Sequence, residues 1–235
     1  MSARFEELAW RETPMGAISL RRRVEPSLSV DVYEVKLGDE FLMSSLFVTG
    51  ETELARLGLR DLEYDGLDVL VGGLGLGYTA RAVLDDARVR SLVVVEALDE
   101  VIDWHLRGLL PPVAGLTSDP RTHLVHGDFF ALVQSHEPAD DEAHGPFHAA
   151  LVDIDHTPRH LLHPSHAGFY TPAGLRLLKR RLRDGGVFAL WSDDPPDAAF
   201  LSVAEEVFDR VTAHVVTFAN PLTGGTSANT VYVAR

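Results

Sequence analysis

The chain has 235 residues, of which 46% are apolar and 24% are charged, so it can bury the core of one α/β domain with a small appendage. With 21 Lys and Arg against 35 Asp and Glu, its formal net charge is −14, which disfavours nucleic acid and anionic membranes as partners. Cysteine is absent, which excludes disulfides and thiolate metal sites. No apolar run reaches the roughly 18 residues of a membrane span, and the first residues are too charged for a signal peptide, so we expect a cytoplasmic protein.

The N-terminal quarter of the chain predicts a small β-rich subdomain. Residues 1–15 have the character of a loosely attached arm. The stretches that follow alternate as strands do, and they are Ala17–Arg23, Val30–Lys36 and Phe41–Val48. Gly38 and Asp39 form a two-residue hairpin turn between the last two. Glu51–Leu62 has helical spacing, so we predict a subdomain over 1–66 that ends in a linking helix.

Beyond residue 66 the pattern changes to alternating strands and helices, which predicts a second domain over 67–235. The predicted parallel strands are Asp68–Val71, Leu92–Glu96, His123–His126, Ala149–Ile154 and Val187–Trp191. The predicted helices are Tyr78–Asp86, Asp99–Leu109, Phe129–Ser135, Pro172–Arg183 and Asp197–Val211. We expect a polar surface loop over 136–146 and a final antiparallel pair, His214–Phe218 with Thr230–Val233. The fold class is therefore α/β, with a Rossmann-like doubly wound sheet whose last strands are antiparallel.

Candidate ligand-binding residues follow the first two strands of this domain, where nucleotides bind in such sheets. Gly73, Gly75 and Gly77 form a glycine loop that leads into a helix. Their G-x-G-x-G spacing differs from the G-x-G-x-x-G of NAD sites, which disfavours an oxidoreductase. Glu96 ends the second strand, where an acid accepts both ribose hydroxyls of a nucleoside. A tight β–α turn and a helix N-terminal charge are the purely structural alternatives.

Acidic residues also follow the next two strands. Asp128 and Phe129 come after the third strand, where Asp128 is suited either to accept from an adenine amino group or to cap the helix that follows. Asp153 comes after the fourth strand, and a carboxylate at the end of a buried strand is costly unless it is paired or functional. A glycine loop and three acids at successive strand ends together indicate a ligand-binding site at the carboxyl edge of the sheet.

These motifs resemble the spermidine synthase (polyamine aminopropyltransferase) family, a branch of the class I S-adenosylmethionine-dependent methyltransferase fold. The resemblance covers roughly residues 67–192 and is carried by GLGLGYTARAVL, VVVEALDEVI, DPRTHLVHGDFF, HAALVDIDH and FYTPAGLRLLKRRLRDGGVFALW. It implies that the three glycines, Glu96, Asp128 and Phe129 bind S-adenosylmethionine or its decarboxylated form. It also implies that Asp153 is the catalytic carboxylate and that the chain forms a homodimer, with contacts through the hairpin of residues 30–48.

Three stretches depart from the family pattern, and one of them is the family's D-x-x-D-P after the fourth strand, which here reads DIDHTP over residues 153–158. Leu76 stands where the family has an Asp that contacts the aminopropyl end of the decarboxylated cofactor. The segment ETELARLGL lacks the Tyr-His pair with which the family helps to hold its amine. The sequence therefore leaves ordinary S-adenosylmethionine open as the cofactor.

The segment after the fourth strand is rich in histidine, with His156, His160, His163 and His166 in eleven residues. Imidazoles suit transition metals, but the prolines in the segment break any common helical face, so we expect no metal. The resemblance instead implies a gate over the site, for which Tyr170 is a candidate substrate-loop residue.

Further candidate residues lie beside Asp153 and after the fifth strand. Asp155 and His156 are candidates for accepting a proton together with Asp153. Asp193 or Asp194 is a candidate for binding a cationic group of the substrate, and a loop acid before Pro195 and Pro196 is the structural alternative.

We therefore predict a transferase that moves an aminopropyl group from a sulfonium nucleoside to a small amine, as in polyamine biosynthesis. Methyl transfer from S-adenosylmethionine to a small molecule is the first alternative. A non-catalytic nucleotide-binding or interaction module is the second. The acidic edge of the sheet suits a sulfonium and a protonated amine, and the expected partner is a small amine or another small nucleophile.

Overall fold

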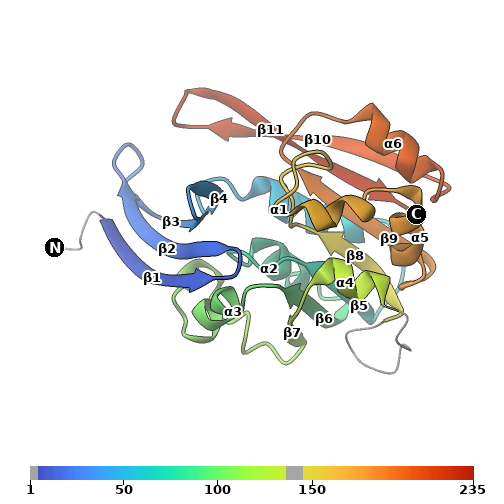
Figure 1. Ribbon diagram of the computed structural model, residues 1–235, viewed down its shortest axis with the longest axis horizontal. Coiled ribbons are helices and arrows are strands. Elements are labelled where there is room, and N and C mark those ends of the chain that lie inside the picture. Colours follow the sequence, from blue (N-terminus) through green and yellow to red (C-terminus); the bar gives the residue numbers. More distant parts are fainter. Residues whose placement is uncertain (1–4, 136–144) are drawn as a thin grey trace.

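The computed structural model describes residues 5–135 and 145–235 and contains two sheets that lie side by side (Figure 1). The N-terminal sheet is an antiparallel meander of β1 (Phe5–Thr13), β2 (Gly16–Glu25), β3 (Val30–Leu37) and β4 (Glu40–Ser44). The larger sheet has seven strands in the order β10-β11-β9-β8-β5-β6-β7. Its strands are β5 (Leu67–Gly72), β6 (Val89–Glu96), β7 (Thr122–His126), β8 (Phe147–Val152), β9 (Leu182–Ser192), β10 (Val211–Asn220) and β11 (Gly225–Ala234).

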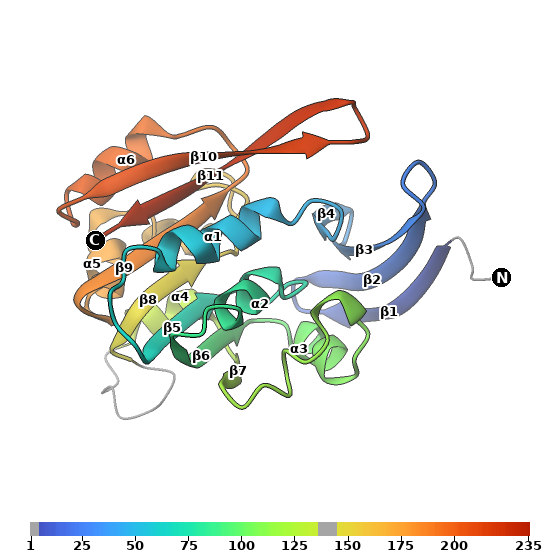
Figure 2. The ribbon, with the colours of Figure 1, turned by 180° about the vertical axis from the view of Figure 1, so that it is seen from behind.

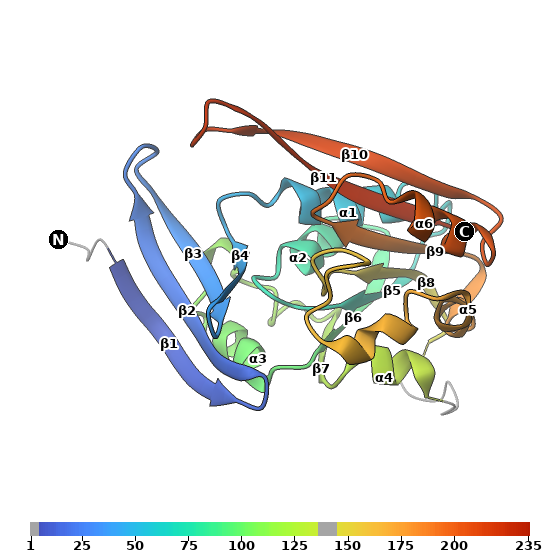
Figure 3. The ribbon, with the colours of Figure 1, turned by 45° about the horizontal axis from the view of Figure 1, so that its top comes forward.

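The order of the large sheet confirms the predicted fold class. Strands β5 to β9 pair in parallel, whereas β11 pairs antiparallel with both β9 and β10. The order in which the strands are added reverses at β5, because β6 and β7 lie on one side of it and β8 lies on the other. The loops after β5 and β8 therefore diverge and leave room between them. This switch point faces the N-terminal sheet (Figure 3).

Helices cover both faces of the large sheet (Figures 1 and 2). One face carries α1 (Thr49–Leu59), α2 (Tyr78–Leu84) and α3 (Asp99–Leu106), and the other carries α4 (Phe129–Gln134), α5 (Pro172–Lys179) and α6 (Ala198–Glu205). Short 3-10 turns occur at Pro111–Val113 and Pro164–Gly168. Because both faces are covered, the strands are apolar on both sides: Val69 and Val71 join one core cluster, and Leu70 joins the other.

The first strand corrects the sequence-based expectation of a loose arm over 1–15. Residues 5–13 pair with β2 along most of its length, from Phe5 opposite Arg23 to Thr13 opposite Gly16. Most of these residues are exposed, so the apolar alternation of a half-buried strand is missing from the sequence. Backbone pairing and the ion pair between Glu6 and Arg22 hold the strand in place.

Helix α1 does more than link two subdomains, because it packs on the large sheet against β8, β9 and β11 and on helix α2. Gly58 allows this close approach, since a Cβ there would lie 2.5 Å from Leu151 Cδ2 and 3.3 Å from Ala189 Cβ. The domain boundary at residue 66 stays a prediction, but the helix itself is docked on the domain that follows it.

Some predicted ends were wrong. Helix α5 ends at Lys179 instead of Arg183, because Leu182 already pairs with Phe147 in the sheet. Helix α6 ends at Glu205, well before the predicted end. The predicted polar loop over 136–146 lies almost wholly outside the described residues. None of the helices in the described part of the chain has both the length and the apolar character needed to cross a bilayer.

Substituting Gly58→Val tests the docking of α1. The added side chain collides with Leu151 and Ala189, so we expect the free energy of unfolding to fall by about 1–3 kcal/mol in chemical denaturation. Arg56→Val makes a similarly branched residue at an exposed position of the same helix and serves as the control. Equal stability of the two variants would contradict the tight contact.

Candidate active site

Two cavities meet between the N-terminal sheet and the carboxyl edge of the large sheet. The first has a volume of about 360 Å³ and contains Glu51, and we call it the Glu51 chamber. The second has a volume of about 310 Å³ and contains Glu96, and we call it the Glu96 chamber. Met43, Gly75 and Asp153 line both chambers, so they mark the junction.

The glycine loop between β5 and α2 shapes this junction. Gly73, Gly75 and Gly77 have φ angles of +91°, +47° and +86°, which residues with a Cβ rarely adopt. A Cβ at Gly73 would collide with the carbonyl oxygen of Asp153, and one at Gly75 would lie 2.7 Å from Met43 Sδ. The glycines therefore bring the loop against β8 and β4, and they leave its backbone exposed to both chambers.

Glu96 ends β6 and lies in the wall of the Glu96 chamber. One of its carboxylate oxygens accepts a hydrogen bond from Leu74 N at 2.9 Å, and the other accepts one from Leu98 N at 2.9 Å. Burial raises the pKa of Glu96 despite these bonds. The backbone thus holds the carboxylate in one orientation, with its edge at the cavity where the resemblance implies a ribose.

Asp128 has the structural role that the sequence left open, because its Oδ1 accepts from Phe130 N at 2.8 Å and from Ala131 N at 3.2 Å and so caps α4. It also lines the Glu96 chamber, as does Phe129, whose ring packs under Gly72. One residue therefore both begins the helix and faces the cavity. The two functions that the sequence offered for Asp128 are compatible.

The rest of the Glu96 chamber is apolar and comes from both sheets. Ile18, Val35 and Leu37 of the N-terminal sheet face Leu98 and Val101 of the large domain. An apolar slot with carboxylates at its rim matches a purine nucleoside, whose flat ring is apolar on its faces and donates from its edge and from its ribose. The residues present therefore fit the nucleoside part of the implied cofactor.

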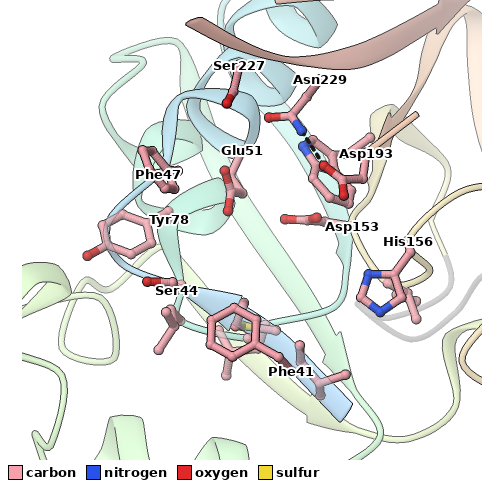
Figure 4. A pocket seen from close by; sticks show the side chains of 18 of the residues that line it. Phe41, Ser44, Phe47, Glu51, Tyr78, Asp153, His156, Asp193, Ser227 and Asn229 are labelled. Atoms are coloured by element: carbon pink, nitrogen blue, oxygen red, sulfur yellow. Dashed lines mark hydrogen bonds between the residues drawn. The ribbon is translucent and has the colours of Figure 1, made fainter. Parts of the chain in front are cut away.

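Asp153 stands at the junction of the two chambers, directly after β8 (Figure 4). Its backbone N–H donates to Gly72 O at 2.9 Å, and its Oδ2 accepts from Thr79 Oγ1 at 2.6 Å. Burial raises the pKa of Asp153 to about 6. A carboxylate with this pKa is mostly ionised at pH 7 and is still able to accept a proton.

Glu51 faces Asp153 across the Glu51 chamber and is a residue that sequence reasoning missed (Figure 4). It lies in the first turn of α1, where an acid is favoured by the helix dipole and gives no sign of function. Burial, followed by the charges of Asp153 and Asp193, raises its pKa to about 8. Glu51 is therefore mostly neutral at pH 7 in the ligand-free protein.

The far side of the Glu51 chamber carries Asp193, which Asn229 Nδ2 contacts through a hydrogen bond of 2.9 Å to Asp193 Oδ1. Aromatic side chains supply much of the remaining wall, namely Phe41, Phe47, Tyr78, Trp191 and Phe218. Among the described residues that line this chamber there is no Lys or Arg. Three carboxyl groups thus face an aromatic cavity, which is the environment that alkylammonium groups prefer.

Asp155 and Tyr170 lie elsewhere than the sequence predicted. Asp155 is 1% exposed and lines neither chamber. Its carboxylate accepts from Leu162 N at 2.7 Å and from Tyr170 Oη at 2.8 Å, and it lies 2.8 Å from His166 Nδ1. Asp155 and Tyr170 therefore anchor the histidine-rich segment through buried hydrogen bonds, and neither side chain is placed to contact a substrate.

The histidines of this segment lie in two pairs, with ring centroids 4.9 Å apart for His156 and His160 and 5.9 Å apart for His163 and His166. His156 lines the Glu51 chamber, and its Nε2 lies 3.1 Å from Glu40 Oε1 on the β3–β4 hairpin. His163 and His166 line the Glu96 chamber. Over residues 5–135 and 145–235, no group of three or more His, Asp or Glu side chains is arranged to hold a metal ion.

Comparison with solved structures shows the fold. A spermidine synthase in complex with the transition-state analogue AdoDATO superposes with a TM-score of 0.73 at 17% identity, over 97% of this chain and 73% of that one. The spermidine synthase of Thermotoga maritima superposes with a TM-score of 0.72 at 18% identity, over 97% and 72%. The chain has the spermidine synthase fold.

The sequence is also similar to a curated protein, polyamine aminopropyltransferase 2 of Pseudomonas aeruginosa. The two are 32% identical over 157 residues, which are 64% of this chain and 42% of the relative. The chain thus matches less than half the length of that relative. No family model matches the chain. The resemblance predicted from the strand-end motifs is confirmed by these relatives.

Asp155→Ala tests the anchoring role. The substitution leaves the buried donors of Leu162, Tyr170 and His166 without their acceptor, so we expect the free energy of unfolding to fall by about 2–4 kcal/mol in urea titrations. Asp194→Ala on a nearby exposed loop is the control, with an expected change within about 0.5 kcal/mol. A stability unchanged by Asp155→Ala would contradict the anchor.

Glu51→Gln tests how much the burial of this carboxyl group lowers the stability of the protein at high pH. A carboxyl whose pKa is raised in the folded state retains a proton that the unfolded chain releases, so stability falls as pH rises from about 4.5 to about 8. The neutral amide removes this loss. We expect the variant to match the parent at pH 5 and to be more stable by about 1–3 kcal/mol at pH 8.5 in thermal denaturation. Glu53→Gln, which changes the Arg56 ion pair on the same helix, should not show this pH dependence.

Proposed function

We propose that this protein transfers the aminopropyl group of decarboxylated S-adenosylmethionine to a small amine. The observation that carries the proposal is the junction at Asp153, where a slot suited to a nucleoside meets a cavity suited to alkylammonium groups. The relatives named for this activity share the fold and part of the sequence. A transferase of this kind needs the sulfonium of its co-substrate at such a junction, with the nucleoside in one cavity and the aminopropyl group in the other.

In this proposal the Glu96 chamber binds the nucleoside. Glu96 accepts from the ribose hydroxyls, Asp128 accepts from the adenine amino group, and Phe129 borders the ring. The glycine loop lies at the junction and allows the sulfonium to approach its backbone closely.

The charge of the Glu51 chamber favours the decarboxylated cofactor over S-adenosylmethionine itself. Three carboxyl groups, with no Lys or Arg among the described lining residues, attract the aminopropyl ammonium. The ionised carboxylates among them repel the α-carboxylate that S-adenosylmethionine carries at this end, because like charges close together raise the free energy. This observation favours aminopropyl transfer over methyl transfer, although Leu76 takes the place of the family's acid.

Asp153 accepts the proton of the acceptor amine, and the neutral nitrogen then attacks the carbon next to the sulfonium. A nitrogen–carbon bond forms, the carbon–sulfur bond breaks, and its electron pair stays on sulfur, which leaves as methylthioadenosine. The protein supplies orientation and a base, and the sulfonium supplies the leaving group. His156 and Asp193 line the same chamber, so we expect them to contact the acceptor.

Isothermal titration with a set of nucleosides tests the binding half of this proposal. We expect methylthioadenosine and decarboxylated S-adenosylmethionine to bind at micromolar concentration, S-adenosylmethionine to bind at least about tenfold more weakly, and NAD not to bind. Mass spectrometry of products from an amine panel then shows whether the transferred group is aminopropyl or methyl. If none of the sulfur nucleosides binds below millimolar concentration, the proposal fails.

Asp153→Asn tests the role of the base. We expect turnover to fall by about 10²–10⁴-fold while the affinity for methylthioadenosine stays within about threefold, because the amide keeps the shape and cannot take the proton. Asp194→Asn, on an exposed loop outside both chambers, should retain full turnover. Unchanged turnover in Asp153→Asn would show that another group accepts the proton.

A further inference from the structure

Glu51 and Asp153 reach the same cavity from opposite directions. Glu51 comes from the N-terminal turn of α1, whereas Asp153 follows β8, about a hundred residues later in the chain. Figure 4 shows the two carboxyl groups pointing toward one another across the chamber. Helix α1 is fixed on the sheet through Gly58 and its neighbours, so this approach is imposed by the packing.

Among the described residues that line the Glu51 chamber, no Lys or Arg compensates the charge of Glu51. The titratable groups that face it are Asp153, Asp193 and Tyr78, and His156 lines the same chamber. The nearest arginine on its own helix, Arg56, is occupied by Glu53 at the surface. Two acids that face each other in a cavity cannot both ionise without a large cost, so they keep one proton between them.

We propose that Glu51 and Asp153 form a proton-sharing pair that binds one alkylammonium group and releases its proton when it does so. The ammonium is the aminopropyl end of the co-substrate or the protonated acceptor amine. This inference rests on the proposed function, since both need an alkylammonium ligand in the Glu51 chamber. Glu51 is thereby a binding residue that determines which end groups the chamber accepts.

The exchange is balanced in charge. The free pair carries one proton and one negative charge, and the occupied pair carries two negative charges around one ammonium. One proton leaves to solvent, and no other reactant is needed. Because the pKa of Glu51 is about 8 in the free protein, affinity for an alkylammonium should rise by up to about tenfold per pH unit below pH 8 and level off above it.

Isothermal titration at pH 7.0 in two buffers of different ionisation enthalpy measures the released protons directly. The probes are decarboxylated S-adenosylmethionine, 1,4-diaminobutane added to the methylthioadenosine complex, and methylthioadenosine alone. We expect about one proton to be released with the ligand that occupies the pair and none with methylthioadenosine, which has no ammonium. The first two probes show which ammonium the pair holds.

Three variants separate this pair from a general charge effect. Glu51→Gln should reduce proton release to below about 0.2 per ligand, flatten the affinity between pH 6.5 and 8.5, and weaken alkylammonium binding by at least about tenfold at pH 8.5. Glu51→Asp should retain the release, because it restores an acid at the same place. Glu53→Gln, a partly exposed acid in the same helix, should behave as the parent protein does.

The outcomes distinguish this inference from the function on which it rests. Failure of methylthioadenosine to bind would overturn the proposed function. If methylthioadenosine binds normally but alkylammonium binding releases no proton in the parent protein, the carboxyl pair alone is overturned. The same holds if proton release is unchanged in Glu51→Gln. Methylthioadenosine binding to Glu51→Gln with the parent's affinity serves as the check that this variant is folded.

Discussion

The close contact between the end of β5 and the end of β8 is the constraint on which the site depends. Gly72 O accepts from Asp153 N, Gly73 lies against the Asp153 carbonyl, and Thr79 at the start of α2 holds the Asp153 side chain. A larger residue at Gly73 would push β5 and β8 apart at the point where the strand order of the sheet reverses. This contact fixes Asp153 between two cavities, and the other groups of the site are arranged around it.

The residues that sequence analysis found share one origin. Glu96, Asp128 and Asp153 follow parallel strands, and parallel strands bring their carboxyl ends to one edge whatever the details of packing. Asp155 shows the limit of this rule. It is only two residues beyond Asp153, yet the chain turns between them, and its carboxylate enters a buried network with Tyr170 and His166. Position after a strand predicts the edge of the sheet but not the direction of a side chain in the loop that follows.

Glu51 and β1 were missed for a different reason, because both depend on contacts between distant segments. Glu51 is an acid in the first turn of a helix, where acids are common, and only the docking of α1 on β8 and β9 brings it to Asp153. Strand β1 exposes most of its side chains, so its sequence lacks the alternation that burial imposes. In both cases the structure depends on a segment that is distant in the sequence, and a local sequence pattern does not identify that segment.

The site also shows how a cavity can be selective without a positive residue. An acid buried beside other acids is held in its neutral form, which weakens the folded protein as pH rises, as argued for Glu51. A cation that enters the chamber reverses this effect, because it stabilises the ionised forms that the cavity alone disfavours. An anionic end group adds to the repulsion, and a neutral one changes nothing. The unfavourable placement of Glu51 beside Asp153 lowers the stability of the protein without ligand, and it therefore gives the chamber its preference for ammonium groups. Aromatic side chains in the wall, such as Trp191 and Tyr78, strengthen this preference through cation–π contacts and add no charge of their own.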